Sequence, residues 1–377
     1  MKIKRKESDM AQFEFPVPMY YIAKLTKTVP PLSNVLHNLE VSKYGSRLKS
    51  VQVDRPIYVT GMARAGTTIT LEMLSNHPDI ANHRYLHMVM PYIPHWIQMI
   101  ADKTPIMLTP TERMHKDGIV VNRTSPEAVE EIFWQRYFEN ILDETKTNVM
   151  RADTRNPKFE VFYRDHIRKL LADQHRKRYA AKNNYNVTRM EYIQKIFPDV
   201  KFLLIVRNPF NHIASLMKQD IIFTELERQD PRLLDWTKII GHREFGSAKM
   251  CINIDNTELV KEIRKDWTNK KTYVMGWAKY WASVYSHMHQ TLQKNKKIAD
   301  SSLVVRYETL CESPAETIDQ IFNHVELDVR KFKKKPEYVK SLHPPAYYSV
   351  EYTDEEKESI RKFCGPVAKL YDYDLDA

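Results

Sequence analysis

Short apolar runs alternate with longer stretches of helical periodicity along the chain. Residues 56–61 form an apolar, β-branched run, and residues 66–76 follow with an apolar set suited to a buried helix, which Pro78 ends. The most apolar run is residues 202–206, and another helical stretch follows it. Because strands alternate with helices, the pattern predicts an α/β domain in which helices flank a central parallel sheet.

The rest of the chain continues this alternation. We expect helices over 125–142 with Ser125 as N-cap, over 159–172, around 272–292, from Ser313 and from Thr353, and strands within 178–186 and 301–310. Residues 1–50 are predicted as a helical or irregular lead-in, and residues 51–377 as a single domain.

Composition narrows the class of protein. Of 377 residues, 42% are hydrophobic and 28% charged, which is ordinary for a globular protein. The net charge of +10 favours an anionic ligand, but the basic runs are not interleaved with aromatic residues, so we expect no nucleic-acid partner. Three widely spaced cysteines and no secretory pattern predict a reducing compartment, the cytoplasm. The longest aliphatic run is too short to span a membrane.

The strand–turn–helix that begins at residue 56 predicts an anion site. Backbone N–H groups and the positive end of a helix dipole gather at such a helix start, and Gly61 and Gly66 allow turns that a side chain forbids. The loop approaches the pattern G-x-x-x-x-G-K-[ST] but has Thr67 in place of lysine. The apolar strand 202–206 ends in Arg207 rather than in an acid for magnesium, so cleavage of a nucleoside triphosphate is not supported. A tight turn without a ligand remains the alternative.

A second anion site is predicted at the end of the strand 202–206. Arg207 follows this strand directly, and Ser215 comes eight residues later in the next helix. Ligands of open α/β sheets bind at the carboxyl ends of strands, and arginine binds two phosphate oxygens at once. Two such sites together favour one ligand that carries two phosphate groups.

These two elements resemble the sulfotransferases that use 3′-phosphoadenosine 5′-phosphosulfate (PAPS). The segment "ARAGTT" is similar to their 5′-phosphosulfate loop, with Ala63 where proline is commoner, and "RNPFNHIAS" is similar to their 3′-phosphate element, with Asn208 in place of an acid. The resemblance extends over roughly residues 55 to 370 and is greatest to the bacterial type. It implies a fold like that of P-loop nucleotide kinases, PAPS as sulfate donor and no required metal.

The resemblance also implies roles for individual residues. The donor is held by the loop and by the second element, which together supply Arg64, Ala65, Gly66, Thr67, Thr68, Arg207 and Ser215. Arg64 and Lys182 stabilise charge during transfer. For the base that takes the acceptor proton we expect His83, with His87, Asp117 and Glu127 as rivals, because Asn186 stands where a histidine is possible.

The acceptor is not fixed by the sequence. Aromatic residues and prolines within 85–110, together with the basic surplus, favour a carbohydrate hydroxyl, and a protein tyrosine, a phenol, a lipid or another small molecule stays open. Gly365 is the only glycine in the last hundred residues, so the sequence does not show which segment closes over adenosine. The oligomeric state is not predicted either. Two other functions remain: a P-loop kinase-like phosphotransferase, and a protein that binds PAPS or 3′,5′-ADP without catalysis.

Overall fold

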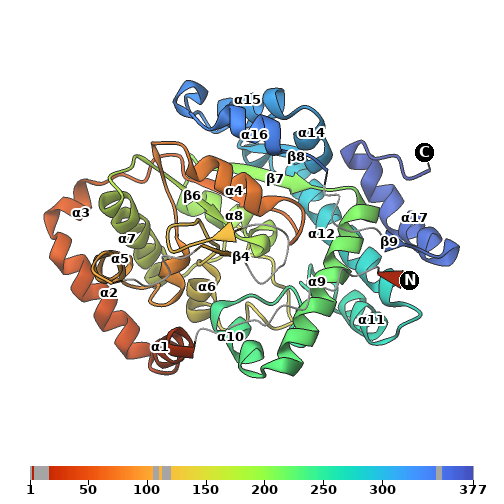
Figure 1. The fold of residues 1–377 in the computed structure, drawn as a ribbon, viewed down its shortest axis with the longest axis horizontal. Helices are drawn as coiled ribbons and strands as arrows, with labels where there is room; N and C mark the ends of the chain where they lie inside the picture. The colour runs from red at the N-terminus through yellow and green to blue at the C-terminus, as the bar shows by residue number, and fades with distance from the viewer. Residues whose placement is uncertain (1, 4–16, 105–109, 113–119, 345–349, 377) are drawn as a thin grey trace.

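The central feature of the computed structural model is a parallel sheet. The structure describes residues 2–3, 17–104, 110–112, 120–344 and 350–376. The strands of this sheet are β2 (Ile57–Thr60), β3 (Ile80–Ala81), β6 (Arg178–Lys182), β7 (Lys201–Val206) and β8 (Ser302–Arg306). They pair in the order β3-β6-β2-β7-β8, and every pair is parallel. The predicted α/β fold with a central parallel sheet is confirmed (Figure 1).

Helices cover both faces of the sheet, and the segments before the sheet are helical. The described α-helices are α1 (Val17–Thr28), α2 (Pro30–Tyr44), α3 (Ser46–Ser50), α4 (Thr67–Ser75), α5 (Pro94–Asp102), α6 (Glu131–Tyr137), α7 (Pro157–Asp173), α8 (Met190–Ile196), α9 (Pro209–Gln229), α10 (Arg232–Ile240), α11 (Thr257–Thr268), α12 (Tyr273–Lys294), α13 (Lys296–Asp300), α14 (Tyr307–Glu312), α15 (Pro314–His324), α16 (Lys335–Ser341) and α17 (Asp354–Ala368). Short 3₁₀ helices are η2 (Tyr85–Met88), η3 (Asn184–Thr188), η4 (Val329–Lys331) and η5 (Lys369–Tyr371). Two antiparallel pairs lie outside the sheet: β1 (Lys2–Ile3) with β9 (Val350–Glu351), and β4 (Thr111–Glu112) with β5 (Val120–Val121).

The central strands are buried on both faces, which explains their continuous apolar runs. Ile57 and Val59 join the cluster that contains residues of α4 and α15, whereas Tyr58 joins the cluster built on α7 and α12. Side chains of a strand alternate between the faces, so a strand covered on both sides must be apolar at every position. Figure 1 shows α4 and α15 on one side of the sheet and α7 on the other.

Two boundaries differ from the sequence predictions. The helix expected from Ser125 begins at Glu131, because the preceding residues bind the chain near residue 84 instead: Tyr85 N–H donates to the Ser125 carbonyl and Glu127 N–H donates to the His83 carbonyl, at 2.9 and 3.0 Å. The strand expected over 301–310 ends at Arg306, and α14 follows without a break. At the start of α6, tertiary pairing outweighs the local pattern.

The register of the sheet brings two loops together. Thr60, the last residue of β2, lies beside Leu204 of β7. Both strands therefore end at the same edge, and the loops after Thr60 and Val206 are neighbours. The division into a lead-in over 1–50 and one domain over 51–377 stays a prediction. None of the described helices is long and apolar enough to cross a membrane.

Candidate functional site

The loop between β2 and α4 depends on two glycines. Gly61 has φ of +144°, and a Cβ there would collide with the carbonyl oxygen of Ile205 in β7. Gly66 has φ of +109°, and its Cβ would come within 2.5 Å of the Tyr307 ring. These conformations and close approaches exclude a side chain at both positions, so the chain can turn tightly from β2 into the start of α4.

Side chains from β6 and its following turn hold the first turn of α4. Lys182 Nζ donates to Thr68 Oγ1 at 3.0 Å, and the Thr67 hydroxyl donates to Asn184 Oδ1 at 3.3 Å. Because β6 lies directly beside β2 in the sheet, these contacts follow from the strand order. The structure thus places the Lys182 ammonium at the loop, as an electrostatic role requires.

The second predicted element lies against the first. Arg207 is 4% exposed, and its Nη1 donates to the carbonyl of Arg64 at 3.0 Å. Arg64 Nε in turn donates to Ser215 Oγ at 3.2 Å. Arg64 has φ of +71°, a conformation uncommon for a residue with a side chain, and these contacts hold it there. The loop, the β7 tip and α9 therefore form one cluster of donor groups.

His212 and Tyr307 support this cluster, and the sequence analysis missed both. The His212 Nε2 donates to the Ala63 carbonyl at 2.8 Å, while its Nδ1 accepts from Trp281 Nε1 at 3.2 Å. Burial, with the nearby Arg207 charge, lowers the pKa of His212 to about 3, so the ring is neutral and fixes the loop by its hydrogen bonds. Tyr307 lies under the Arg207 guanidinium, 5.0 Å from its ring centroid.

Asn208, the departure from the family pattern, has a structural role here. Its side chain accepts a hydrogen bond from Phe210 N–H and caps α9, and its own N–H donates to Glu308 Oε1 at 3.1 Å. Glu308 also accepts from Tyr373 Oη, at 2.5 Å. An amide therefore caps the helix where an acid is usual, and the carboxylate is supplied by the start of α14.

His83 is buried away from solvent among aromatic rings. It is 2% exposed, stacks on His166 with centroids 5.0 Å apart, and neither ring nitrogen has a hydrogen-bond partner among the described residues. Burial, together with the Lys169 charge, lowers its pKa to about 3. A base needs a nitrogen within reach of the acceptor, so this setting does not support the expected role. The rival His87 is fully buried, and burial lowers its pKa well below the usual range.

The rival Glu127 has a different setting. It lines a pocket of about 300 Å³ together with Thr68 and Glu72. Its Oε1 accepts from the Ala128 N–H at 2.6 Å, and Glu72 accepts from Tyr338 Oη at 2.9 Å. Glu127 lies at this pocket because residues 125–127 pair with residues 83–85, the same pairing that replaces the expected first turns of α6. The last rival, Asp117, lies outside the described residues.

A chain of polar contacts also continues from the loop to the segment after α10. Asn184, the partner of Thr67, donates through Nδ2 to Glu244 Oε1 at 2.8 Å. Glu244 Oε2 lies 3.4 Å from His242 Nδ1. Sequence reasoning missed this pair, although "GHREFG" places a histidine and an acid within a glycine-bounded turn.

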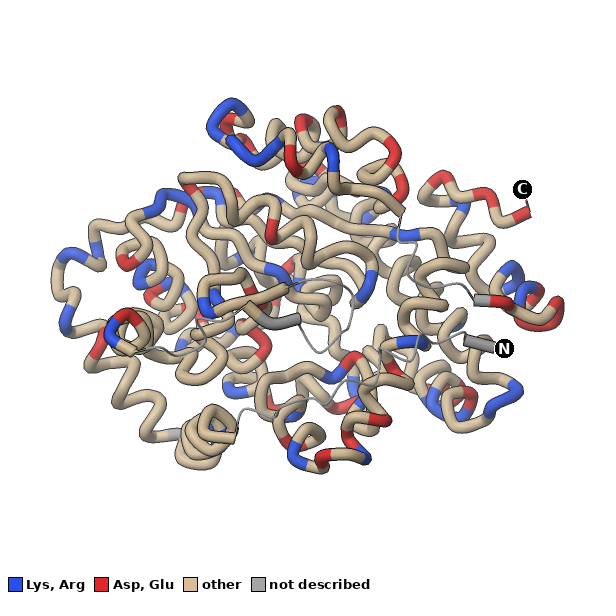
Figure 2. Tube along the Cα trace, in the orientation of Figure 1, with Lys and Arg blue, Asp and Glu red and all other residues tan. Residues whose placement is uncertain are grey.

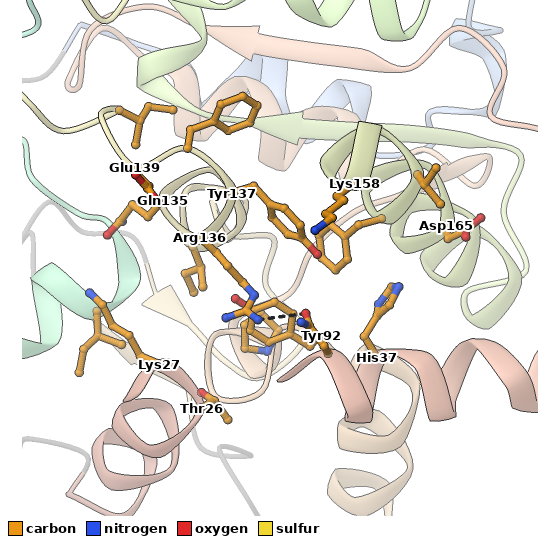
Figure 3. A pocket seen from close by; sticks show the side chains of 18 of the residues that line it. Thr26, Lys27, His37, Tyr92, Gln135, Arg136, Tyr137, Glu139, Lys158 and Asp165 are labelled. Carbon is orange, nitrogen blue, oxygen red and sulfur yellow. Dashed lines mark hydrogen bonds between the residues drawn. The ribbon is translucent and has the colours of Figure 1, made fainter. Parts of the chain in front are cut away.

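The larger of the two described pockets lies elsewhere. It has a volume of about 910 Å³ and lies between α1 and α2 on one side and α6 and α7 on the other. Figure 3 shows Tyr137, Arg136 and Lys158 around it. None of the predicted site residues lines it, so size alone does not identify the site of chemistry.

Comparisons with known proteins agree with this geometry. The model of the sulfotransferase family matches residues 56–242, from the start of β2 to just beyond α10. Curated proteins include no match to this chain. A sulfotransferase from Mycobacterium avium matches with a TM-score of 0.53 and 14% identity over 90% of this chain and 83% of its own. One from Mycobacterium tuberculosis gives 0.49 and 14% over 87% and 81%.

At such identities the structural likeness concerns the fold alone, and the family assignment comes from the sequence match. Both agree with the resemblance first seen in the two phosphate elements. Through residues 56–242, the chain belongs to the sulfotransferase family.

Proposed function

We propose that this protein transfers a sulfuryl group from PAPS to an acceptor hydroxyl, on a carbohydrate in preference to other small molecules. The observation that carries the proposal is the contact of Arg207 with Arg64 and of Arg64 with Ser215, which brings together the two strand ends where we expect anions to bind. A donor with phosphate groups at both the 3′ and the 5′ positions needs such a pair. A nucleoside triphosphate needs only the first.

The residues present fit the donor. Arg207 and Ser215 would hold the 3′-phosphate, and the loop N–H groups from Ala65 to Thr68 would hold the 5′-phosphate. PAPS supplies an activated sulfuryl group: the acceptor oxygen bonds to sulfur as the bond to the 5′-phosphate oxygen breaks, and 3′,5′-ADP leaves.

Side chains of this protein would stabilise the negative charge that develops during transfer, and one of them would take the proton of the acceptor hydroxyl. Arg64, Lys182 and Thr68 would donate to oxygens that gain negative charge, and hydrogen bonds hold these side chains at the loop. For the acceptor proton we now prefer Glu127 to His83, since Glu127 lines a pocket that Thr68 also lines. We keep a cytoplasmic location in the proposal, in agreement with three buried, unpaired cysteines.

The test compares nucleotides by thermal shift. We expect 3′,5′-ADP to stabilise the protein more than 5′-AMP or ATP does. We expect EDTA to leave this stabilisation unchanged. Arg207→Ala should weaken 3′,5′-ADP by about 1.5–3 kcal/mol and leave 5′-AMP nearly unchanged. Arg330→Ala, at a guanidinium that is 86% exposed, is the matched control.

Transfer is then measured with labelled PAPS and a cell-envelope glycan extract. Labelled glycan supports the full proposal. Donor binding without transfer to glycans, phenols, peptides or lipids indicates a binding protein. Magnesium-dependent turnover of ATP would favour a kinase-like phosphotransferase instead.

A further inference from the structure

The two N-terminal helices carry an exposed apolar face. Among the described residues, large hydrophobic side chains at least 40% exposed are few, and more than half lie on or directly beside α1 and α2. We call these the N-terminal apolar face: Tyr21, Ile22, Leu25, Val29, Val35 and Leu39. Single exposed apolar residues are normal on a protein surface, whereas a contiguous exposed apolar patch marks an interaction site. The i, i+4 spacing of Tyr21 with Leu25, and of Val35 with Leu39, places each pair on one side of its helix.

The face is a fixed surface, because the opposite sides of both helices are anchored. In α1, Tyr20 and Ala23 are buried in a cluster with Trp236 of α10. In α2, Glu40 accepts from Lys169 Nζ of α7 at 2.8 Å, with both side chains 0% exposed. The helical spacing that turns these residues inward turns the apolar face outward.

Within the segment that carries this face, the exposed charged residues are basic. Five exposed basic residues lie between positions 17 and 50, and the one acid of that segment, Glu40, is fully buried. Lys24 is paired with Asp235 of α10, so the basic charge is concentrated at the end toward α3, on Lys43, Arg47 and Lys49. Figure 2 shows this blue group at the outer edge of the molecule.

We propose that the N-terminal apolar face docks onto the surface of an anionic lipid bilayer. Helices that lie in a membrane interface combine aliphatic and aromatic residues on one side with lysine and arginine at the flanks. Anionic headgroups attract such basic flanks. A second copy of this chain is a poorer occupant, because a symmetric pair would bring two basic segments against each other.

Co-sedimentation with vesicles tests the proposal on the full chain. We expect binding to vesicles of phosphatidylcholine with about 30% phosphatidylglycerol, and roughly tenfold weaker binding to phosphatidylcholine alone. Leu25→Ser combined with Leu39→Ser should weaken binding to the anionic vesicles by about tenfold. Arg47→Glu combined with Lys49→Glu should remove the preference for anionic lipid.

The matched control is Val161→Ser combined with Leu370→Ser, at two exposed apolar positions outside the face. This control should bind as the unchanged protein does, and circular dichroism confirms that each variant is folded. Absence of binding to anionic vesicles, or an equal loss in the control, overturns the proposal. So does a dimer in sedimentation equilibrium that only the Leu25→Ser and Leu39→Ser variant loses, since the occupant would then be a second copy.

Discussion

The proposed donor side and the proposed acceptor side of the site are built in different ways. On the donor side, strand ends, glycine turns and helix starts follow one another in the sequence, and adjacent parallel strands bring them together. On the acceptor side, Glu127 reaches its pocket only because residues 125–127 pair with residues 83–85. Each element of the first arrangement is marked by a few consecutive residues, whereas the second depends on a backbone pairing that no local pattern marks. A sequence therefore reveals where the donor is held more readily than what receives the sulfuryl group.

The largest effect expected concerns the acceptor side. Glu127→Gln should lower kcat by about 10²–10⁴-fold, because the acceptor proton then has no carboxylate to accept it. The affinity for 3′,5′-ADP should stay unchanged, since the amide can still accept from Ala128 N–H. Steady-state kinetics and thermal shift measure the two quantities. A larger loss of kcat in His83→Gln than in Glu127→Gln would restore His83 as the base.

On the donor side, the rigid turn should be sensitive to a single methyl group. Gly61→Ala should lower the free energy of unfolding by about 2–4 kcal/mol, since it adds strain at a positive φ and a collision with the Ile205 backbone. Denaturant unfolding measures this change. In the control, Gly365→Ala, the new Cβ meets no atom within 4 Å inside α17, so stability should rise by up to about 1 kcal/mol. Equal effects at both positions would show that the loop is not constrained.

The pH dependence of stability separates a buried histidine from a working base. The usual pKa of histidine is 6.5 and burial lowers that of His83 to about 3, so between these values only the unfolded chain binds this proton. The contribution of His83 to the free energy of unfolding is therefore fully present above pH 6.5 and is lost as the pH falls toward 3. His83→Leu should reduce the slope of unfolding free energy in this window by about 1.4 kcal/mol per pH unit.

The comparison uses the difference in slope between the His83→Leu variant and the unchanged protein, because Glu130 changes stability with pH in the opposite direction to His83. Burial raises the pKa of Glu130 to about 7, above its usual 4.5, so its contribution is lost as the pH rises through that range. A slope unchanged by His83→Leu would show that the ring titrates in the folded state.

The smallest effect belongs to one hydroxyl of the donor side. Ser215→Ala removes the acceptor of the Arg64 hydrogen bond and, in our proposal, one donor to the 3′-phosphate. We expect 3′,5′-ADP to bind more weakly by about 0.5–1.5 kcal/mol, as measured by calorimetry. Ser359→Ala, at a half-buried serine of α17 whose hydroxyl donates to the Glu355 carbonyl, serves as control. No change at Ser215 would place the 3′-phosphate on other groups.

The sequence predicted the parts of the fold and site that depend on local patterns. The apolar strands, the glycine turn and the end of β7 at Arg207 could each be identified from a few consecutive residues. Because β2 and β7 are parallel neighbours, the two predicted sites lie at the same edge of the sheet, at the carboxyl ends of strands where ligands of such sheets bind. Tyr307, His212 and Asn184 could not be found in this way, because each reaches the loop from a distant segment. The start of α6 was wrong for the same reason, since backbone pairing with residues 83–85 took the place of the predicted first turns.

The ion pair between Lys169 and Glu40 has a practical consequence for anyone who mutates the N-terminal helices. Glu40→Ala would leave the Lys169 ammonium in a dry interior without its carboxylate, and leaving one member of a buried pair alone costs about 3–5 kcal/mol. A variant at Glu40 should therefore also carry Lys169→Met, which replaces the ammonium with an uncharged side chain of similar length.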